Sequence, residues 1–364
     1  MTIENSIMLG EPYPRRRFLG TTAVAIAAAR LALSVPASAQ SGPAKPEKLP
    51  PPKPGTASFG SLKQIDAGVL NVGYAEAGPS DGPPVLLLHG FPYDIHSYVE
   101  VAPLLAARGF RVIVPHLRGH GTTRFLSSGA FRNGQQAAVA LDIVALMDAL
   151  QIEQAILAGY DWGSRTANII AALWPKRCKA MVSVNGYLIN NLERNKLPLP
   201  PKVEWGWWYQ YNYTTERGRA GLEANRHDLA KLIWKFNSPQ WAFDESTFER
   251  TAASFDNPDY VSIVVHNYRW RLSLAPGESR YRDLEARLAA RPTIAVPTIT
   301  LDGDSDGVAP ATDGTAYAKK FSGLRTHRIV KGVGHNLPQE APQAFADAVV
   351  EVASYSGTPA RKTG

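Results

Sequence analysis

Short apolar runs alternate with amphipathic stretches along most of the chain, and this alternation predicts its elements. Residues 84–88 are continuously apolar, as a strand covered on both faces of a sheet requires. Residues 101–105 and 139–150 instead repeat apolar side chains every three or four positions, which predicts helices. Strands that alternate with helices indicate an α/β chain with a mostly parallel sheet. Short β-rich runs begin at Ser61 and precede the strand at 84–88. Further strands are predicted at 111–114, 155–158, 181–184, 298–301 and 327–330, and further helices at 162–174, near 312–321 and through 345–349.

The alternation is interrupted between residues 187 and 290. This segment contains six of the eight tryptophans, and its pattern predicts mostly helix. We therefore expect an α/β core formed by residues 59–186 and 291–356. A helical cap, or lid, at 187–290 is inserted after the sixth strand, over the carboxyl ends of the strands where such sheets bind ligands.

The first 39 residues have the features of a leader. An Arg-Arg-x-Phe-Leu string at 15–19 is followed by an apolar stretch at 21–33 and by a small-x-small cleavage site at 37–39. This arrangement resembles a bacterial twin-arginine signal. The resemblance implies a precursor that engages the twin-arginine export machinery and a mature chain that begins near Gln40. It predicts a periplasmic or secreted protein, and the alternative is a disordered N-terminus on a cytosolic protein.

The apolar stretch of this leader is too short for a permanent membrane anchor. It has about 13 residues and is interrupted by Arg30, whereas a spanning helix needs about 20. No stable membrane span is therefore expected. Residues 40–58 follow as a Pro-rich linker.

Composition excludes several other classes of protein. With 364 residues, 45% of them hydrophobic, 20% charged and one a cysteine, the chain is not a collagen, a coiled coil or a disulfide scaffold. Its 39 Lys and Arg against 32 Asp and Glu give a net charge of +7. Because no basic run interleaves with aromatic residues, we expect no nucleic-acid partner.

Candidate chemistry centres on Asp161. The motif Gly159-x-Asp161-x-Gly163 lies between a predicted strand and a predicted helix, which is typical of a nucleophile elbow, although Ser usually stands at its centre. His335 follows the last predicted strand and can serve as a base. The loop at 302–307 offers three carboxylates, one of which can orient the imidazole. An ordinary Asp-Gly turn and a helix-capping histidine are the alternatives.

Two backbone N–H groups are candidates for binding a negatively charged oxygen. One belongs to Trp162, directly after the nucleophile, and the other to Phe91, directly after His89 and Gly90. These are main-chain roles, so the side chains do not test them.

These residues resemble the epoxide hydrolases of the α/β-hydrolase superfamily. The resemblance rests, in chain order, on His89-Gly90-Phe91-Pro92, the Asp161 elbow, Trp208-Tyr209-Gln210-Tyr211, Asn267-Tyr268-Arg269, the Gly303-x-x-Asp306 loop and Gly334-His335. It implies an α/β-hydrolase fold in which Asp306 orients His335. It also implies that Tyr209 and Tyr268 open the ring, and that the product is a vicinal diol formed through an ester on Asp161.

The aromatic residues of the lid predict a small apolar substrate, with water as the second reactant. Because the sequence has no phosphate-binding loop and no histidine in a spaced metal-ligand motif, we expect neither a cofactor nor a metal ion. Two other functions stay open. A haloalkane or haloacid dehalogenase uses the same Asp nucleophile, and Trp162 could then bind the halide. A catalytically silent α/β-hydrolase would bind a ligand under the cap without turnover.

Overall fold

The computed structural model describes residues 58–323 and 325–355. The predicted leader and all but the last residue of the predicted linker lie outside the described residues. Among the described residues, none of the helices has the length and apolar character needed to cross a bilayer.

A nine-stranded sheet forms the centre of the described chain, with strand order β1-β2-β4-β3-β6-β7-β8-β9 and the short β5 paired with β2. From β4 to β9 in this order the strands run parallel, whereas β1, β2 and β5 pair antiparallel at one end. The predicted mostly parallel sheet is therefore confirmed. The strands are β1 (Lys63–Ala67), β2 (Leu70–Ala77), β3 (Pro84–Leu88), β4 (Arg111–Pro115), β5 (Arg124–Phe125), β6 (Ala155–Gly159), β7 (Cys178–Val184), β8 (Thr298–Gly303) and β9 (Arg325–Val330).

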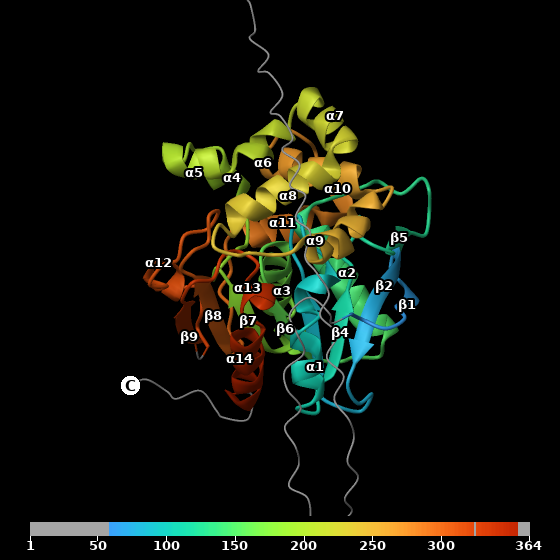
Figure 1. Cartoon of the computed structure of the whole chain (residues 1–364), viewed down its shortest axis with the longest axis vertical. Coiled ribbons are helices and arrows are strands. Elements are labelled where there is room, and N and C mark those ends of the chain that lie inside the picture. The colour runs from blue at the N-terminus through green and yellow to red at the C-terminus, as the bar shows by residue number, and fades with distance from the viewer. Residues whose placement is uncertain (1–57, 324, 356–364) are drawn as a thin grey trace, which may run out of the picture. The chain divides into compact units, whose positions relative to one another are not determined.

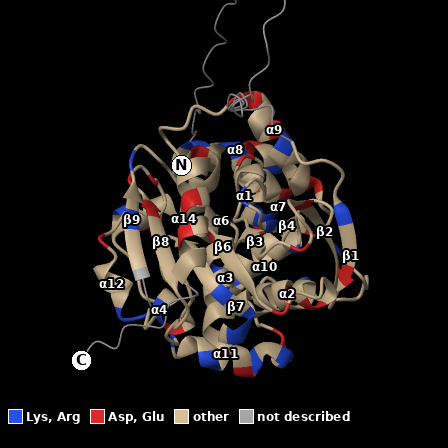
Figure 2. Cartoon of the chain, turned by 90° about the horizontal axis from the view of Figure 1, so that it is seen from below, with Lys and Arg blue, Asp and Glu red and all other residues tan. Residues whose placement is uncertain are grey.

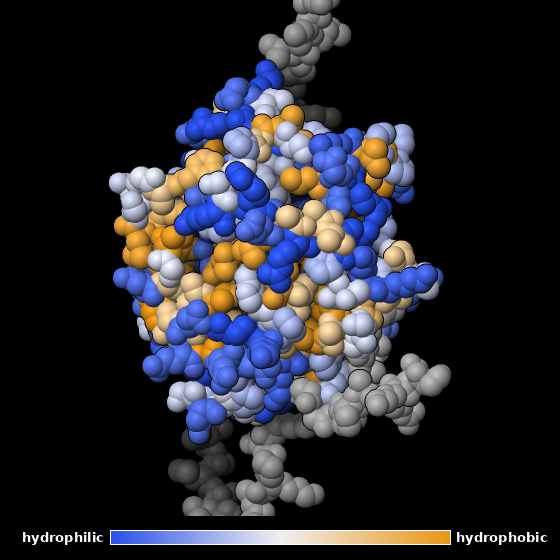
Figure 3. Space-filling model, turned by 180° about the vertical axis from the view of Figure 1, so that it is seen from behind, coloured by the Kyte–Doolittle hydropathy of each residue, from blue (hydrophilic) through white to orange (hydrophobic). Residues whose placement is uncertain are grey.

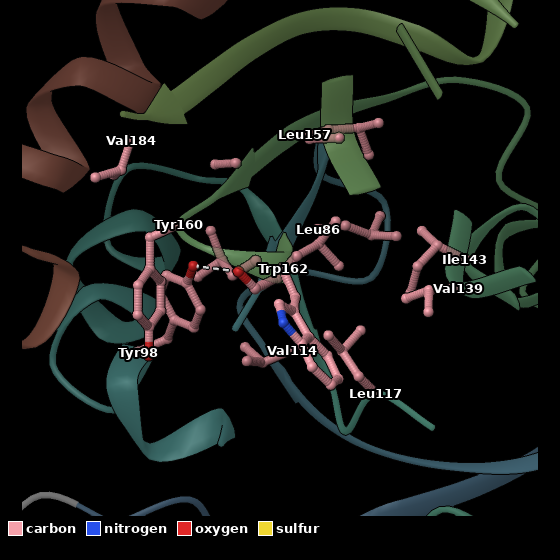
Figure 4. Packing of buried hydrophobic residues seen from close by; sticks show 14 of the residues in the cluster. Leu86, Tyr98, Val114, Leu117, Val139, Ile143, Leu157, Tyr160, Trp162 and Val184 are labelled. Atoms are coloured by element: carbon pink, nitrogen blue, oxygen red, sulfur yellow. Dashed lines mark hydrogen bonds between the residues drawn. The ribbon is translucent and has the colours of Figure 1, made fainter. Parts of the chain in front are cut away.

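Helices cover both faces of this sheet (Figure 1). On one face α2 (Gln136–Ala149) packs against α3 (Trp162–Leu173), and on the other α1 (Val101–Ala106) packs against α14 (Pro342–Tyr355). Central strands such as β3 and β6 are apolar along their length because both of their faces meet a helix. Figure 4 shows part of the resulting core, to which Tyr160 and Trp162 contribute from either side of Asp161.

The segment between β7 and β8 forms a layer of helices above the sheet (Figure 1). Within it, α7 to α9 have amphipathic patterns with apolar residues facing inward, such as Leu222 and Trp234. The helices are α4 (Leu192–Asn195), α5 (Pro201–Gly206), α6 (Trp208–Asn212), α7 (Glu216–Ala224), α8 (Arg226–Asn237), α9 (Glu245–Ala252), α10 (Tyr260–Arg271) and α11 (Arg282–Ala289). We call α4 to α11 the cap. On the face drawn in Figure 3, apolar side chains (orange) lie among polar ones (blue), as on an ordinary protein surface.

Two local expectations differ from the structure. The cap follows the seventh strand rather than the sixth, because the two-residue β5 also pairs with the sheet. The helix expected near 312–321 is reduced to α12 (Thr315–Ala318), since Gly314 has a left-handed φ of 74° and Asp302 accepts a hydrogen bond from the Thr312 N–H. The remaining short helices are η1 (Ile95–Tyr98), η2 (Pro175–Arg177), η3 (Ala253–Asp256), η4 (Ser279–Tyr281) and α13 (Leu337–Glu340).

Candidate active site

Asp161 lies at the sharp turn between β6 and α3. Its φ of 50° and ψ of −121° fall in a region that non-glycine residues rarely adopt, at a cost of about 1–3 kcal/mol. The turn is tight enough that a Cβ on Gly163 would lie 1.8 Å from the carbonyl oxygen of Leu88. A residue held in such strain at the carboxyl edge of a parallel sheet presents its side chain outward, toward the cap.

The carboxylate of Asp161 has two partners that favour its ionised form. Its Oδ1 accepts a hydrogen bond of 2.7 Å from the Phe91 N–H, and its Oδ2 lies 3.6 Å from Nε2 of His335. Burial alone would raise the pKa of Asp161, but the contact and charge of His335, the charge of Arg165 and the Phe91 N–H together lower it. The side chain keeps 20% of its surface exposed, so a small molecule can reach it.

Gly90 sits directly against this carboxylate, so a larger side chain at this position should disturb the site. A Cβ at this position would lie 2.4 Å from Cβ of Asp161 and 2.6 Å from its Oδ1. We expect Gly90→Ala to displace the carboxylate and to lower kcat/KM by about 100-fold, since small misplacements of reacting groups have effects of this size. Steady-state kinetics measures the loss. Gly221→Ala, where no described atom lies within 4 Å of the new Cβ, is the matched control. Unchanged kinetics in Gly90→Ala would show that the carboxylate does not react in this position.

Asp306 is the carboxylate that faces His335. Its Oδ2 lies 2.8 Å from Nδ1 of His335, and its Oδ1 accepts the N–H groups of Val308 and Ala309 at 2.9 and 2.8 Å. Asn185 donates its side-chain amide to Oδ2 at 3.3 Å. The carboxylate is thus fixed by the protein and can hold the imidazole ring in one orientation.

His335 is buried between two carboxylates. Burial lowers the pKa of His335. The charge of Asp306, the hydrogen bonds to Asp161 and Asp306, and the charge of Asp161 outweigh burial and raise the pKa to about 10. Its own backbone N–H donates to Oγ of Ser238, which comes from the loop after α8. At neutral pH the resting ring therefore carries a proton and a positive charge.

Tyr209 on α6 and Tyr268 on α10 bring two phenols from the cap to this site. Their ring centroids lie 5.9 Å apart, and they lie 5.9 and 5.6 Å from the ring of Phe91, whose N–H holds Asp161. Burial, reinforced by the negative charge of Asp161, raises the pKa of both hydroxyls. Both are therefore neutral phenols that retain a proton to donate.

The two backbone amides expected to bind an oxyanion flank the nucleophile. The Phe91 N–H already donates to Asp161. Trp162 is the first residue of α3, where N–H groups have no partner within the helix. The structure thus brings every sequence-predicted site residue to one place.

Some supporting residues carried no signal in the sequence. Ser238 and Asn185 hold His335 and Asp306, yet a serine in a cap loop and an Asn-Gly turn are ordinary features. For Asn185, the only hint is its position directly after a buried strand, at the carboxyl edge of the sheet. Across residues 58–323 and 325–355 no group of three His, Cys, Asp or Glu side chains could hold a metal ion.

Comparisons with known proteins identify the family. A family model described as the alpha/beta hydrolase fold matches residues 83–342. Epoxide hydrolase 2 of Siraitia grosvenorii is 30% identical over 315 residues, which cover 79% of this chain and 96% of that protein. Epoxide hydrolase A of Mycobacterium tuberculosis is 26% identical over 316 residues, covering 79% and 95% respectively.

A solved structure is more similar still. The crystal structure of a candidate epoxide hydrolase from Klebsiella pneumoniae is 57% identical and superimposes with a TM-score of 0.79, covering 80% of this chain and 97% of that one. The family resemblance inferred from the motifs is therefore confirmed. The comparisons support an enzyme rather than a catalytically silent α/β-hydrolase. The chain belongs to the α/β-hydrolase fold family and is a hydrolase of the epoxide hydrolase-like kind.

Proposed function

We propose that the protein hydrolyses an epoxide to a vicinal diol through a covalent alkyl-enzyme ester on Asp161. The observation that carries this proposal is an ionised carboxylate, 3.6 Å from a histidine held by a second carboxylate, next to two neutral phenols. The names of the relatives support the same reaction, since two of them are epoxide hydrolases.

Ring opening needs a nucleophile for carbon and a proton for oxygen. An Asp161 oxygen attacks one ring carbon, and the bond from that carbon to the ring oxygen breaks, so that the electron pair stays on the oxygen. Tyr209 or Tyr268 gives its proton to this alkoxide and becomes a phenolate. A carboxylate that is already ionised performs this step without a base.

Ester hydrolysis then needs an activated water. Once Asp161 is esterified, His335 releases its resting proton to solvent, and it regains a proton after the product has left. The neutral ring takes a proton from water while the hydroxide oxygen attacks the ester carbonyl carbon, and the N–H groups of Phe91 and Trp162 bind the resulting oxyanion. The bond from this carbon to the alkyl oxygen breaks, and the departing oxygen takes the proton from His335. The new carboxylic acid of Asp161 returns its proton to the phenolate. One water is consumed and one diol is formed.

The source of the first product oxygen tests the covalent route. In a single turnover in water labelled with heavy oxygen, the first diol should carry unlabelled oxygen from Asp161, and label should enter the carboxylate instead. Mass spectrometry of the diol and of the peptide that contains Asp161 measures both. A first diol that carries solvent label would mean that water attacks the epoxide directly.

The pH dependence should differ between the two half-reactions. Ester formation removes the negative charge of Asp161, so the pKa of His335 falls from its resting value of about 10 and the ring can act as a base. We expect ester hydrolysis to quicken as pH rises through this lowered pKa. Ester formation should stay flat from about pH 5 to about pH 9, because the pKa of Asp161 is depressed and the phenol pKa values are raised. Rapid-quench mass spectrometry separates the steps, and ester formation that follows the pH profile of a base would contradict the scheme.

Removing the phenol hydroxyls should slow ring opening. We expect Tyr209→Phe and Tyr268→Phe each to lower the rate of ester formation by about 10- to 100-fold, and the double variant by about 1000-fold, because acid catalysis contributes factors of this size. The ring contacts with Phe91 are kept in each variant. Single-turnover kinetics measures the rates, with Tyr355→Phe, far along the chain on α14, as the matched control. A double variant as fast as either single variant would mean that only one hydroxyl reaches the substrate.

Carbon–halogen hydrolysis is the second candidate function. It is favoured by the indole Nε1 of Trp162, a buried donor without a hydrogen-bond partner among the described residues, which could bind a departing halide. Halide release from haloalkanes and haloacetates, measured beside diol formation, distinguishes the two reactions. The paired phenols favour the epoxide because an alkoxide needs a proton and a halide does not.

Export is a separate proposal that rests on residues 1–39. The paired Arg15 and Arg16, the apolar stretch and the small-x-small site support a periplasmic or secreted enzyme that uses the twin-arginine machinery. Fractionation of bacterial cells that express the full chain tests it. The double substitution Arg15→Lys and Arg16→Lys should retain the protein in the cytoplasm, and equal export of both forms would contradict the proposal.

A further inference from the structure

A cavity of about 620 Å³ lies between the loop after β7 and the cap, and Arg165 of α3 forms part of its wall. Its wall carries mostly positive side chains, whereas positive and negative residues lie mixed over the elements visible in Figure 2. Among the described residues that line the cavity, five are cationic and one is acidic. The cations are Arg165, Arg194, Lys196, Arg271 and Arg291, and the acid is Glu204.

Arg165 is the most deeply buried of these cations. Only 7% of its surface is exposed, and its Nε has no hydrogen-bond partner. Across the described part of the chain its side chain makes no hydrogen bond or ion pair that would compensate the charge. Buried charges are ordinarily paired, because the loss of hydration is costly. Asp161 acts on Arg165 through its charge but forms no ion pair with it, so a guanidinium that lines a cavity has an open position for a directly bound anion.

The other charged groups of the wall do not supply that anion. Arg271 donates from Nη1 to the side-chain carbonyl of Gln210 at 3.1 Å and lies over the ring of Trp207. Glu204 is engaged within the cap, where it accepts the Leu199 N–H at 2.8 Å. The nearness of Arg271 adds to the effect of burial and lowers the pKa of Arg165 to about 10, at which Arg165 is still charged at neutral pH. Two cations thus face one space without a carboxylate between them.

Arg165 is also placed toward the reacting carboxylate. It lies four residues after Asp161, hence on the same side of α3 and about 6 Å further along the helix. The negative charge of Asp161 raises the pKa of Arg165, and the positive charge of Arg165 lowers the pKa of Asp161, so the two groups lie near each other. An anion on Arg165 would hold its attached carbon skeleton near the nucleophile.

We propose that Arg165, assisted by Arg271, binds a carboxylate of the substrate, so that the preferred substrates are epoxides that carry a carboxylate group. This inference rests on the proposed epoxide hydrolysis and names its substrate class. The free Nε and the adjacent Nη of Arg165 form an edge with two parallel N–H donors, which matches the two oxygens of a carboxylate. The aromatic rings around Asp161 then receive the apolar part of the same molecule.

Matched pairs of epoxides test the inference. Terminal epoxides whose carboxylate is separated from the ring by one to four methylene groups are each compared with the corresponding amide, which has the same shape without the charge. For at least one length, we expect kcat/KM of the acid to exceed that of the amide by about tenfold or more, as a charge-assisted hydrogen-bonded pair should provide. Equal values at all four lengths would overturn the proposal.

Variants then assign the effect to Arg165. Arg165→Met should reduce the ratio of kcat/KM for the acid to kcat/KM for the amide to about one, and Arg165→Lys should restore part of the preference. Because the charge of Arg165 also favours ionised Asp161, the test is this ratio and not the activity on the amide alone. Arg282→Met, which removes an exposed charge outside the cavity, should keep the preference intact. Equal losses for acid and amide in Arg165→Met would mean that the arginine is only structural. If that variant does not fold, Arg271→Met should weaken the preference, and a preference unchanged in Arg271→Met would exclude the paired site.

Binding separates this inference from the proposed function. Calorimetry with the dihydroxy acid of the preferred length and with its amide needs no turnover, and we expect the acid to bind about tenfold more tightly or better. Hydrolysis of the amides without any preference for the acids would support the proposed epoxide hydrolysis and contradict the proposed substrate class. Tighter binding of the acid without hydrolysis of any epoxide would support the proposed carboxylate site and contradict the proposed reaction.

Discussion

Replacing Asp161 by asparagine is expected to lower kcat for epoxide hydrolysis by at least about ten-thousand-fold, because loss of a covalent nucleophile has effects of this size. A neutral amide attacks carbon poorly, and no other described carboxylate lies as close to Nε2 of His335. The fold should persist. The asparagine Oδ1 can still accept the Phe91 N–H, and Asn tolerates a positive φ better than most residues do.

A second measurement makes this prediction specific to the charge. The negative charge of Asp161 helps to raise the pKa of His335, so Asp161→Asn should lower that pKa, as followed by NMR titration of the imidazole. Asp304→Asn is the matched control, because Asp304 lies in the same loop as Asp306 but accepts the Gly332 N–H at 2.7 Å. Full activity in Asp161→Asn, or inactivity in Asp304→Asn, would require another nucleophile or another orienting acid.

The core of the fold could be predicted because its strands are marked by local sequence. Continuous apolar runs such as 84–88 and 155–159 exist only where both faces of a strand are covered, so the pattern alone indicates a parallel sheet. The two-residue β5 has no such pattern, since its pairing with Leu70 and Asn71 depends on where the chain returns. Individual cap helices were likewise not predicted, because their short amphipathic patterns leave the bounds undefined.

The catalytic site could be predicted in part, and the loop at 302–307 shows where sequence stops being informative. The strand–turn–helix context makes Asp161 conspicuous. The three carboxylates of the loop look equivalent, and only the family resemblance favoured Asp306. In the structure Asp302 accepts the Thr312 N–H and Asp304 the Gly332 N–H, while Asp306 alone among the three meets Nδ1 of His335. Because these partners lie in turns outside the loop at 302–307, no local sequence pattern predicts the hydrogen bonds.

Arg165 illustrates the same limit for specificity. In the sequence it is an arginine in the first turn of a helix, where an exposed side chain is the ordinary expectation. Cap residues that lie 29 or more positions further along the chain, from Arg194 onward, line the cavity together with Arg165. Charge imbalance inside a cavity is a tertiary property, and it emerges only when all lining residues are placed together.

Replacing His335 by glutamine is expected to stop the reaction halfway. Glutamine cannot remove a proton from water, so ester hydrolysis should slow by at least about a thousand-fold, whereas Asp161 can still attack the epoxide. The pKa of Asp161 should rise when the positive neighbour is lost, but Arg165 and the Phe91 N–H still favour its ionised form. Ester formation should therefore be slower and yet complete.

The expected observation is an enzyme that gains the mass of one epoxide at Asp161 and releases almost no diol. Intact-protein mass spectrometry after mixing measures the adduct, and peptide mapping locates it. Asp306→Asn should give the same adduct with a smaller defect in its hydrolysis, because His335 stays in place but loses the carboxylate that orients Nδ1. His227→Gln, on the exposed side of the cap, should form no lasting adduct. If His335→Gln turns over without accumulating the adduct, a group other than His335 activates the water; if it forms no adduct at all, the charge of His335 is needed for the first step as well.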